Sequence, residues 1–107
     1  MNELLRWDIY EIRSSISLQG MMLRGRLRRF ANQQQINFLV ENDEDGQIVR
    51  FAMLTDSNAS GMIEYIKTTV PGAEIEKVRE KITNPVLSKL KVNLDDRYSV
   101  DSPGEGI

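Results

Sequence analysis

Two stripes of apolar residues at helical spacing constrain the fold of this 107-residue chain more than any other feature. The first predicts a helix over 22–34 and consists of Leu23, Leu27, Phe30 and Ala31. The second predicts a helix that ends at Pro71-Gly72 and consists of Ala59, Met62, Ile63, Ile66 and Val70. Asp56 or Ser57 is expected to cap this second helix. Each apolar stripe needs a surface to cover it, which the segments between the helices must supply.

Those segments carry the pattern of β-strands. Strands are predicted over 7–18, 37–41 and 48–53, around Ile75 and Val78, and within 86–94. We expect an irregularity near Ser14-Ser15 in the first strand and a hairpin loop over 42–46. The order β-α-β-β-α-β is typical of an α+β, ferredoxin-like sandwich, in which two helices cover one face of an antiparallel sheet. The segment 86–94 leaves room for a fifth strand.

Length and composition limit the number of domains and the kinds of chemistry that this chain can carry out. Residues 1–94 are predicted to form one domain, followed by a flexible C-terminal tail over 95–107 that contains Pro and Gly. The chain has no Cys and no His, which excludes thiol chemistry, cysteine-ligated metals and histidine general bases. Its beginning does not look like a signal peptide and no stretch is long enough to span a membrane, so a cytoplasmic location is the default.

One segment has the features of an anion site. In Leu18-Gln19-Gly20-Met21-Met22-Leu23-Arg24, a predicted strand passes through a turn into a helix. Unpaired N–H groups and the helix dipole attract anions at such a place, and Arg24 can add a guanidinium. The alternative is that Gly20 only makes a turn and Arg24 is a solvated helix residue. Met21 and Met22 are expected in the core.

Asn42 is a second candidate because it ends the strand that follows this helix, 18 residues after Arg24. In a strand-helix-strand unit, the start of the helix and the end of the next strand can share one edge of the sheet. An amide there can hold a water molecule in place without acting as a base. The alternative interpretation is an ordinary hairpin asparagine.

These residues resemble the acylphosphatase family over most of the chain, roughly 10–94. The similarity lies in Gln19-Gly20, Arg24, Asn42 and Gly46, and in the turn Pro71-Gly72 that leads to Ile75. The resemblance implies a ferredoxin-like sandwich that hydrolyses acyl phosphates to a carboxylate and phosphate. It implies that Arg24 binds the phosphoryl group and that Asn42 orients the attacking water. The implied phosphate-binding loop consists of Ser17, Leu18, Gln19, Gly20, Met21 and Met22.

The chain departs from the family at Ile16, where the family usually has a Gly. This difference predicts a weaker enzyme, and the alternative function is a module that binds phosphate without turning it over. No metal or other cofactor is expected. Asp43, Glu44 and Asp45 are consecutive, so they do not converge easily on one ion.

A nucleic-acid-binding domain is the competing interpretation, because four arginines lie close together in the sequence: Arg24, Arg26, Arg28 and Arg29. An RNA-recognition motif shares the β-α-β-β-α-β order, but its third strand carries paired aromatic residues. Here that strand has only Phe51, and the net charge of the chain is −2. We therefore expect the partners to be a small acyl phosphate or inorganic phosphate, with no nucleic acid and no membrane. The chain is expected to be a monomer.

Overall fold

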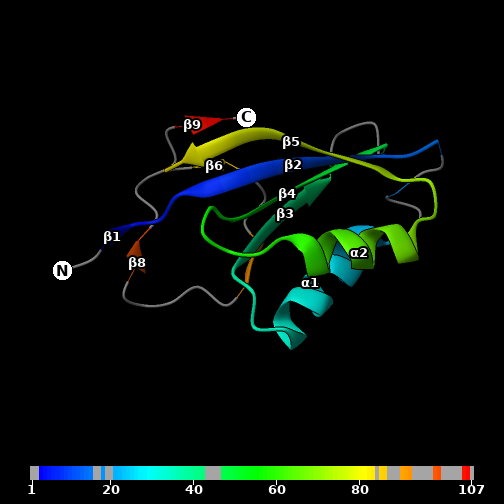
Figure 1. The fold of residues 1–107 in the computed structure, drawn as a ribbon, viewed down its shortest axis with the longest axis horizontal. Coiled ribbons are helices and arrows are strands. Elements are labelled where there is room, and N and C mark those ends of the chain that lie inside the picture. Colours follow the sequence, from blue (N-terminus) through cyan, green and yellow to red (C-terminus); the bar gives the residue numbers. More distant parts are fainter. Residues whose placement is uncertain are drawn as a thin grey trace.

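The main sheet has five strands in the order β5-β2-β4-β3-β7 (Figure 1). In that order they are β5 (Glu74–Ile82), β2 (Trp7–Arg13), β4 (Ile48–Leu54), β3 (Phe38–Asn42) and β7 (Leu90–Val92). Each strand is antiparallel to its neighbours. The structure is a computed structural model, which describes residues 3–15, 18, 21–42, 47–83, 85–86, 90–92, 98–99 and 105–106.

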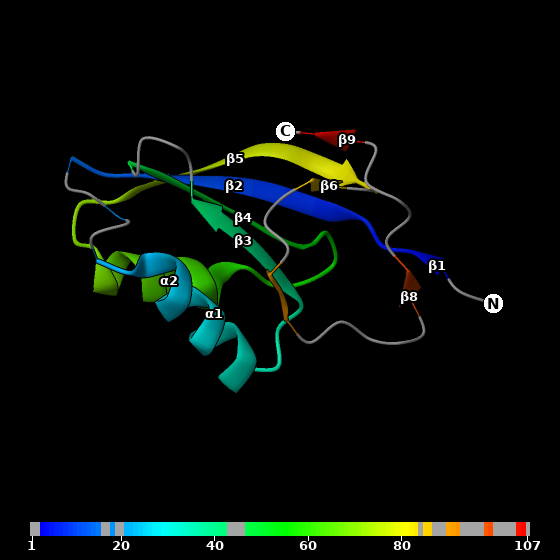
Figure 2. The same cartoon turned by 180° about the vertical axis from the view of Figure 1, so that it is seen from behind.

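Two helices, α1 (Leu23–Gln33) and α2 (Ser60–Thr69), cover one face of this sheet (Figures 1 and 2). The chain order of its principal elements is therefore β2-α1-β3-β4-α2-β5, which confirms the ferredoxin-like α+β fold. The predicted fifth strand is also present, because β7 pairs with the free edge of β3. Neither helix in the described part of the chain is long and apolar enough to cross a membrane.

Two short ladders lie outside the main sheet. β1 (Glu3–Leu4) pairs in parallel with β8 (Tyr98–Ser99), and β6 (Pro85–Val86) pairs in parallel with β9 (Glu105–Gly106). β8 and β9 belong to the segment 95–107, and the rest of that segment lies outside the described residues. The flexibility of this tail stays a prediction.

Both faces of the main sheet bury apolar side chains. On the helix side, Phe51 of β4 stacks on Tyr10 and on Phe38, with ring centroids 4.8 and 5.5 Å apart. The buried residues of this helix-side core are Tyr10, Ile12, Leu18, Leu23, Leu27, Ala31, Phe38, Val40, Val49, Phe51, Met53, Met62, Ile66 and Val70. The core on the opposite face is smaller and consists of Leu5, Trp7, Ile9, Leu39, Ala52 and Ile82.

Acidic side chains accept hydrogen bonds near both ends of β2. Near its start, the buried carboxylate of Asp8 accepts a hydrogen bond of 2.8 Å from the Thr55 hydroxyl and one of 3.2 Å from the Lys81 N–H. Near its other end, on the face opposite the helices, Arg50 Nε donates to Glu11 Oε2 at 2.9 Å. Arg13 also donates to Glu11, at 2.6 Å. Buried carboxylates are tolerated where such donors surround them.

The predicted boundaries are wrong in two places. The first strand ends at Arg13 and does not reach Leu18, which lies in a turn. Its pairing irregularities fall between Trp7 and Tyr10, against β5, and not at Ser14-Ser15. The second helix begins after Ala59, so neither Asp56 nor Ser57 is its cap. A hydrogen bond from the Ser60 N–H to Asn58 Oδ1, 3.0 Å long, takes that place.

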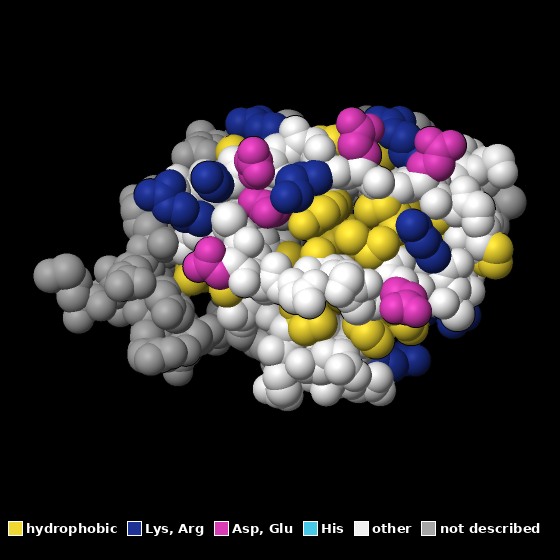
Figure 3. All heavy atoms as spheres, viewed as in Figure 1, with side chains coloured by type: hydrophobic (Ala, Val, Ile, Leu, Met, Phe, Trp, Pro, Cys, Tyr) yellow, Lys and Arg dark blue, Asp and Glu magenta, His cyan; other side chains and the backbone are white. Residues whose placement is uncertain are grey.

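β5 forms one edge of the main sheet and is strongly charged. Within the described residues, only Ile82 of this nine-residue strand is fully buried. The exposed charged residues are Glu74, Glu76, Lys77, Arg79, Glu80 and Lys81. Figure 3 shows acidic and basic side chains interspersed along this edge of the molecule.

Candidate anion-binding site

Asn42 and the start of α1 lie at the same end of the sheet. Asn42 pairs with Val49, and Val49 pairs with Ile12 near the end of β2, from which the chain turns towards α1. Because side chains alternate along a strand, Asn42 shares the helix face with the buried Phe38 and Val40. Figure 2 shows that β3 ends on the side of the molecule where α1 begins. The two predicted site residues therefore occupy one face and one end of the fold.

The side-chain oxygen of Asn42 is a buried acceptor without a hydrogen-bond donor in the part of the chain that the structure describes. A buried acceptor in this state costs about 1–3 kcal/mol unless a donor is supplied. Asn37, at the other end of β3, has the same property. Only Asn42 combines it with a position beside the start of α1.

The turn before α1 is anchored at Leu18. The Leu18 side chain is fully buried in the helix-side core, and its carbonyl accepts hydrogen bonds of 3.2 Å from the N–H groups of both Met21 and Leu23. Met22, between these two donors, has a left-handed backbone with φ 57° and ψ 37° and is 74% exposed. The prediction that Met22 lies in the core is wrong, while Met21 does pack against the core.

Several amide groups at the start of α1 have no acceptor. Within the described residues, no hydrogen bond is made by the N–H groups of Met22, Arg24 and Gly25. No side chain caps this end, and no acidic residue lies in the first turn. A left-handed residue directly before a helix directs successive amides towards one side, an arrangement that binds anions in many proteins. The helix dipole adds roughly half a positive charge at the same place.

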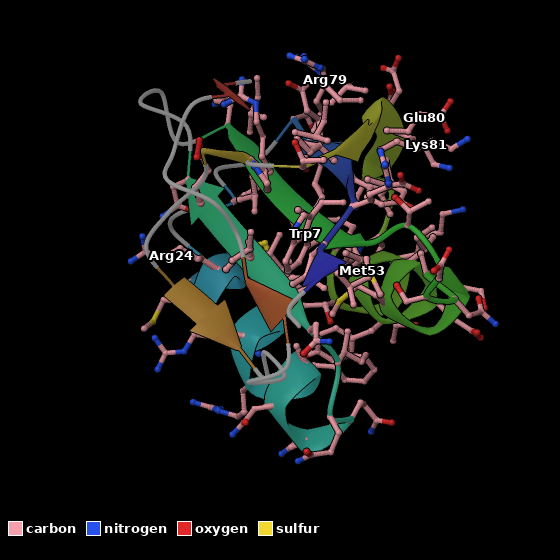
Figure 4. All side chains as sticks on the ribbon, turned by 90° about the vertical axis from the view of Figure 1, so that its left-hand side faces the viewer. Trp7, Arg24, Met53, Arg79, Glu80 and Lys81 are labelled. Carbon is pink, nitrogen blue, oxygen red and sulfur yellow. The ribbon has the colours of Figure 1, made fainter. Side chains whose placement is uncertain are left out.

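Arginine side chains strengthen the positive potential around these amides. Arg24 is exposed in the first turn and makes no hydrogen bond or ion pair with the described residues. Figure 4 places it at the periphery, far from the interior residues Trp7 and Met53. Arg28 and Arg29 are exposed as well, and α1 contains no acidic residue. Such a helix lacks the acidic first turn that usually neutralises a dipole, so its start can accept an external anion.

Part of the predicted loop lies outside the described residues. Leu18, Met21 and Met22 are described and form the turn above, whereas Ser17, Gln19 and Gly20 are not, and neither is Ile16. The same holds for the acidic residues 43–45 of the hairpin loop. Among the described residues, no group of three acidic side chains could hold a metal ion.

The sequence did not predict the contact that Arg26 makes with the turn before α1. Its Nε donates a hydrogen bond of 3.0 Å to the carbonyl of Met21, so its side chain reaches back from the helix to the turn. In the sequence it is one of four clustered arginines, and nothing distinguishes it from Arg28 or Arg29. No signal in the sequence could therefore have predicted its contact with the turn.

Comparison with known families decides the relationship. The family model described as Acylphosphatase matches residues 16–88, well over half of the chain. The chain belongs to the acylphosphatase family. The match includes the turn before α1, Arg24 and Asn42, and it agrees with the observed fold. Membership in the acylphosphatase family supports a hydrolase or phosphate-binding protein. No curated protein and no solved structure matches the chain.

Proposed function

We propose that this acylphosphatase-family chain hydrolyses small acyl phosphates to a carboxylate and inorganic phosphate. The single observation that carries the proposal is the buried Oδ1 of Asn42, which has no donor among the described residues and lies at the end of the sheet where α1 begins. A water molecule that donates a hydrogen bond to this oxygen satisfies it and is held beside the start of α1. The Asn42 amide thereby fixes the direction in which the water attacks.

The phosphoryl group is bound by the start of α1. The N–H groups of Met22, Arg24 and Gly25, which have no acceptor among the described residues, donate to its oxygens, and the Arg24 guanidinium adds charge-assisted hydrogen bonds. The bound water attacks phosphorus, the bond between phosphorus and the carboxylate oxygen breaks, and both protons of the water remain with the phosphate product. The carboxylate leaves as a stable anion, so it needs no proton from the protein. This reaction depends on position and charge neutralisation, which suits a chain without Cys or His.

Hydrolysis of benzoyl phosphate by the purified chain, with and without a chelator, tests the proposal. We expect turnover that the chelator does not change, with inorganic phosphate as a competitive inhibitor. Activity that disappears with the chelator and returns with Mg²⁺ contradicts the mechanism. Phosphate binding without turnover supports the alternative, a non-catalytic phosphate-binding module, and Ile16→Gly is then the first change to make.

Two matched pairs of variants separate the roles of the site residues. Asn42→Ala should abolish most turnover and leave phosphate affinity nearly intact, because the water contributes to the transition state. Its control is Asn37→Ala, which removes the same kind of buried oxygen from the other end of β3. Arg24→Ala should weaken both phosphate binding and turnover, by about tenfold or more. Its control is Arg28→Ala on the same helix. Wild-type turnover in both Asn42→Ala and Arg24→Ala refutes the site.

We also propose that the chain is a cytoplasmic monomer that binds neither nucleic acid nor membranes. The position of Phe51, the lone aromatic residue of β4, supports the absence of nucleic-acid binding. Phe51 is fully buried and stacked on Tyr10 on the helix side of the sheet. A base cannot stack on a side chain in that position. A tight, sequence-selective shift of RNA or DNA at physiological salt would overturn this point.

A further inference from the structure

We infer that Arg26 is a positioning residue, which orients the Met22 amide towards a bound phosphoryl group. The inference rests on the proposed function and concerns how the same site is built. Its starting point is the hydrogen bond of 3.0 Å from Arg26 Nε to the Met21 carbonyl. This bond joins the first turn of α1 to the residue before its N-cap, five positions earlier in the chain.

The peptide group between Met21 and Met22 links this contact to the direction of the Met22 N–H. No cis peptide bond occurs in the described part of the chain, so the carbonyl of Met21 and the N–H of Met22 point in opposite directions. When Arg26 holds the carbonyl, the N–H is fixed on the opposite side of the peptide plane. That N–H is one of the three amides at the start of α1 that have no acceptor within the described part of the chain.

The other hydrogen bonds of the turn do not fix this peptide. The bonds from Met21 and Leu23 to the Leu18 carbonyl hold the two neighbouring amides. The Gly25 N–H would donate to the Met21 carbonyl if the helix began one residue earlier, but this bond is absent. Arg26 Nε is therefore the only donor that the Met21 carbonyl has within the described residues. Without it, the peptide can rotate and turn the Met22 N–H away.

The left-handed backbone of Met22 makes this restraint more important. A residue other than Gly at φ 57° is held against its intrinsic preference for the ordinary backbone regions. The Met22 side chain is mostly exposed and contributes little packing to offset this cost. The hydrogen bond from Arg26 to the Met21 carbonyl opposes relaxation of the turn. Such relaxation would turn the amides at the start of α1 away from one another.

A set of four proteins tests the role of Arg26: the wild type, Arg26→Met, Arg26→Gln and Arg28→Met. In glutamine the side-chain N–H₂ follows as many carbons as Nε does in arginine, so Arg26→Gln keeps a donor for the Met21 carbonyl and loses the charge. Arg26→Met keeps the length of the stem and loses both. Arg28→Met loses an equal charge from the same helix, where no contact with the turn exists.

Inorganic phosphate is titrated into each ¹⁵N-labelled protein, and the Met22 amide resonance is followed together with the dissociation constant. We expect Arg26→Met to bind phosphate about three- to tenfold more weakly than Arg28→Met, the effect of one lost hydrogen bond. Its Met22 amide should shift less at saturation. Arg26→Gln should match Arg28→Met in both measurements, because the donor is retained. Circular dichroism checks that all four proteins are folded.

The results distinguish the inference from the function on which it rests. If Arg26→Met and Arg28→Met bind phosphate equally, or if Arg26→Gln is as weak as Arg26→Met, the positioning role is refuted and the proposed site stands. If the wild type binds no phosphate and the Met22 amide does not move, the proposed function fails, and the role of Arg26 fails with it.

Discussion

Two exposed residues with left-handed backbones flank α1. Met22 precedes the helix at φ 57°, and Gln35 follows its end at φ 58°. Side chains with a Cβ resist this conformation, whereas Gly adopts it freely. The two residues differ in context, because Met22 lies in the candidate site and Gln35 lies at the far end of the helix.

Replacing either residue with Gly should therefore stabilise the fold. We expect Met22→Gly and Gln35→Gly each to raise the free energy of unfolding by about 0.5–1 kcal/mol, measured by urea denaturation. Gln34→Gly serves as the control, since the φ of Gln34 is −91° and Gly offers no relief there. That variant should lose about 0.5–1 kcal/mol. A loss of stability in all three would show that the left-handed positions store no strain.

At the scale of single residues, the spacing of Arg24 and Asn42 predicted that the start of a helix and the end of the next strand share one end of the sheet, and the start of α1 and Asn42 do lie there. The catalytic roles of both residues stay predictions. The exposure of Met22 could not be predicted, because an apolar residue beside a helical stripe usually belongs to the core. The contact of Arg26 depends on how the turn closes, which the spacing of arginines does not encode.

Among the elements, β2 and β4 are joined by an ion-pair network on the face opposite the helices. Arg50 lies directly across from Glu11 in the register and also approaches Glu41 Oε2 at 3.7 Å. Burial alone would raise the pKa of Glu11, but the hydrogen bonds from Arg50 and Arg13 lower that pKa below its ordinary value. The charged form of Glu11 is therefore favoured in the folded chain.

This lowered pKa predicts how stability depends on pH. At acidic pH the unfolded chain binds a proton at Glu11 before the folded chain does, so the free energy of unfolding falls as pH decreases. The contribution is complete above the ordinary value of 4.5 and is lost as pH falls through the lowered pKa of the folded state. We expect Glu11→Gln to flatten this acid limb in urea denaturation between about pH 6 and pH 2. Glu64→Gln, an exposed position on α2, should leave it unchanged, and an unaltered limb in Glu11→Gln would contradict the assignment.

The order of the elements was predictable, whereas some of their ends were not. Period-3.6 stripes and period-2 strands predicted α1 and β4 to within one residue at each end, whereas α2 begins at Ser60, later than the expected cap implies. The strand predicted over 7–18 was too long because Ile16 and Leu18 continue the apolar pattern beyond Arg13. Leu18 is buried, but from a turn, and burial alone does not distinguish a turn from a strand. Asp56 and Ser57 are residue types that often cap helices, but in the folded chain both lie before the N-cap position.

For the molecule as a whole, the two cores share the same strands. Ile9 and Ile12 of β2 are both at most 1% exposed, and they face opposite sides of the sheet. Because β2 contributes side chains to both cores, neither core can unfold while the other holds β2 in place. The fold should thus behave as one cooperative unit, as most single domains of this size do.

This coupling can be measured with Trp7, the only tryptophan. Ile9→Ala and Ile12→Ala should each lower the free energy of unfolding by about 2–5 kcal/mol. In both variants the transition followed by Trp7 fluorescence should coincide with the one followed by far-ultraviolet circular dichroism. If Ile12→Ala shifts the dichroism transition and leaves the fluorescence transition unchanged, the two cores unfold separately.

The charged edge strand β5 has a consequence for the behaviour of many copies together. A nine-residue edge strand offers a row of backbone groups on which another chain could add a strand and start an aggregate. On β5, six of the nine residues carry acidic or basic side chains, and joining two copies would require removing water from these charges. The edge that closes the fold on one side is therefore also its protection against intermolecular β-sheet growth at high concentration.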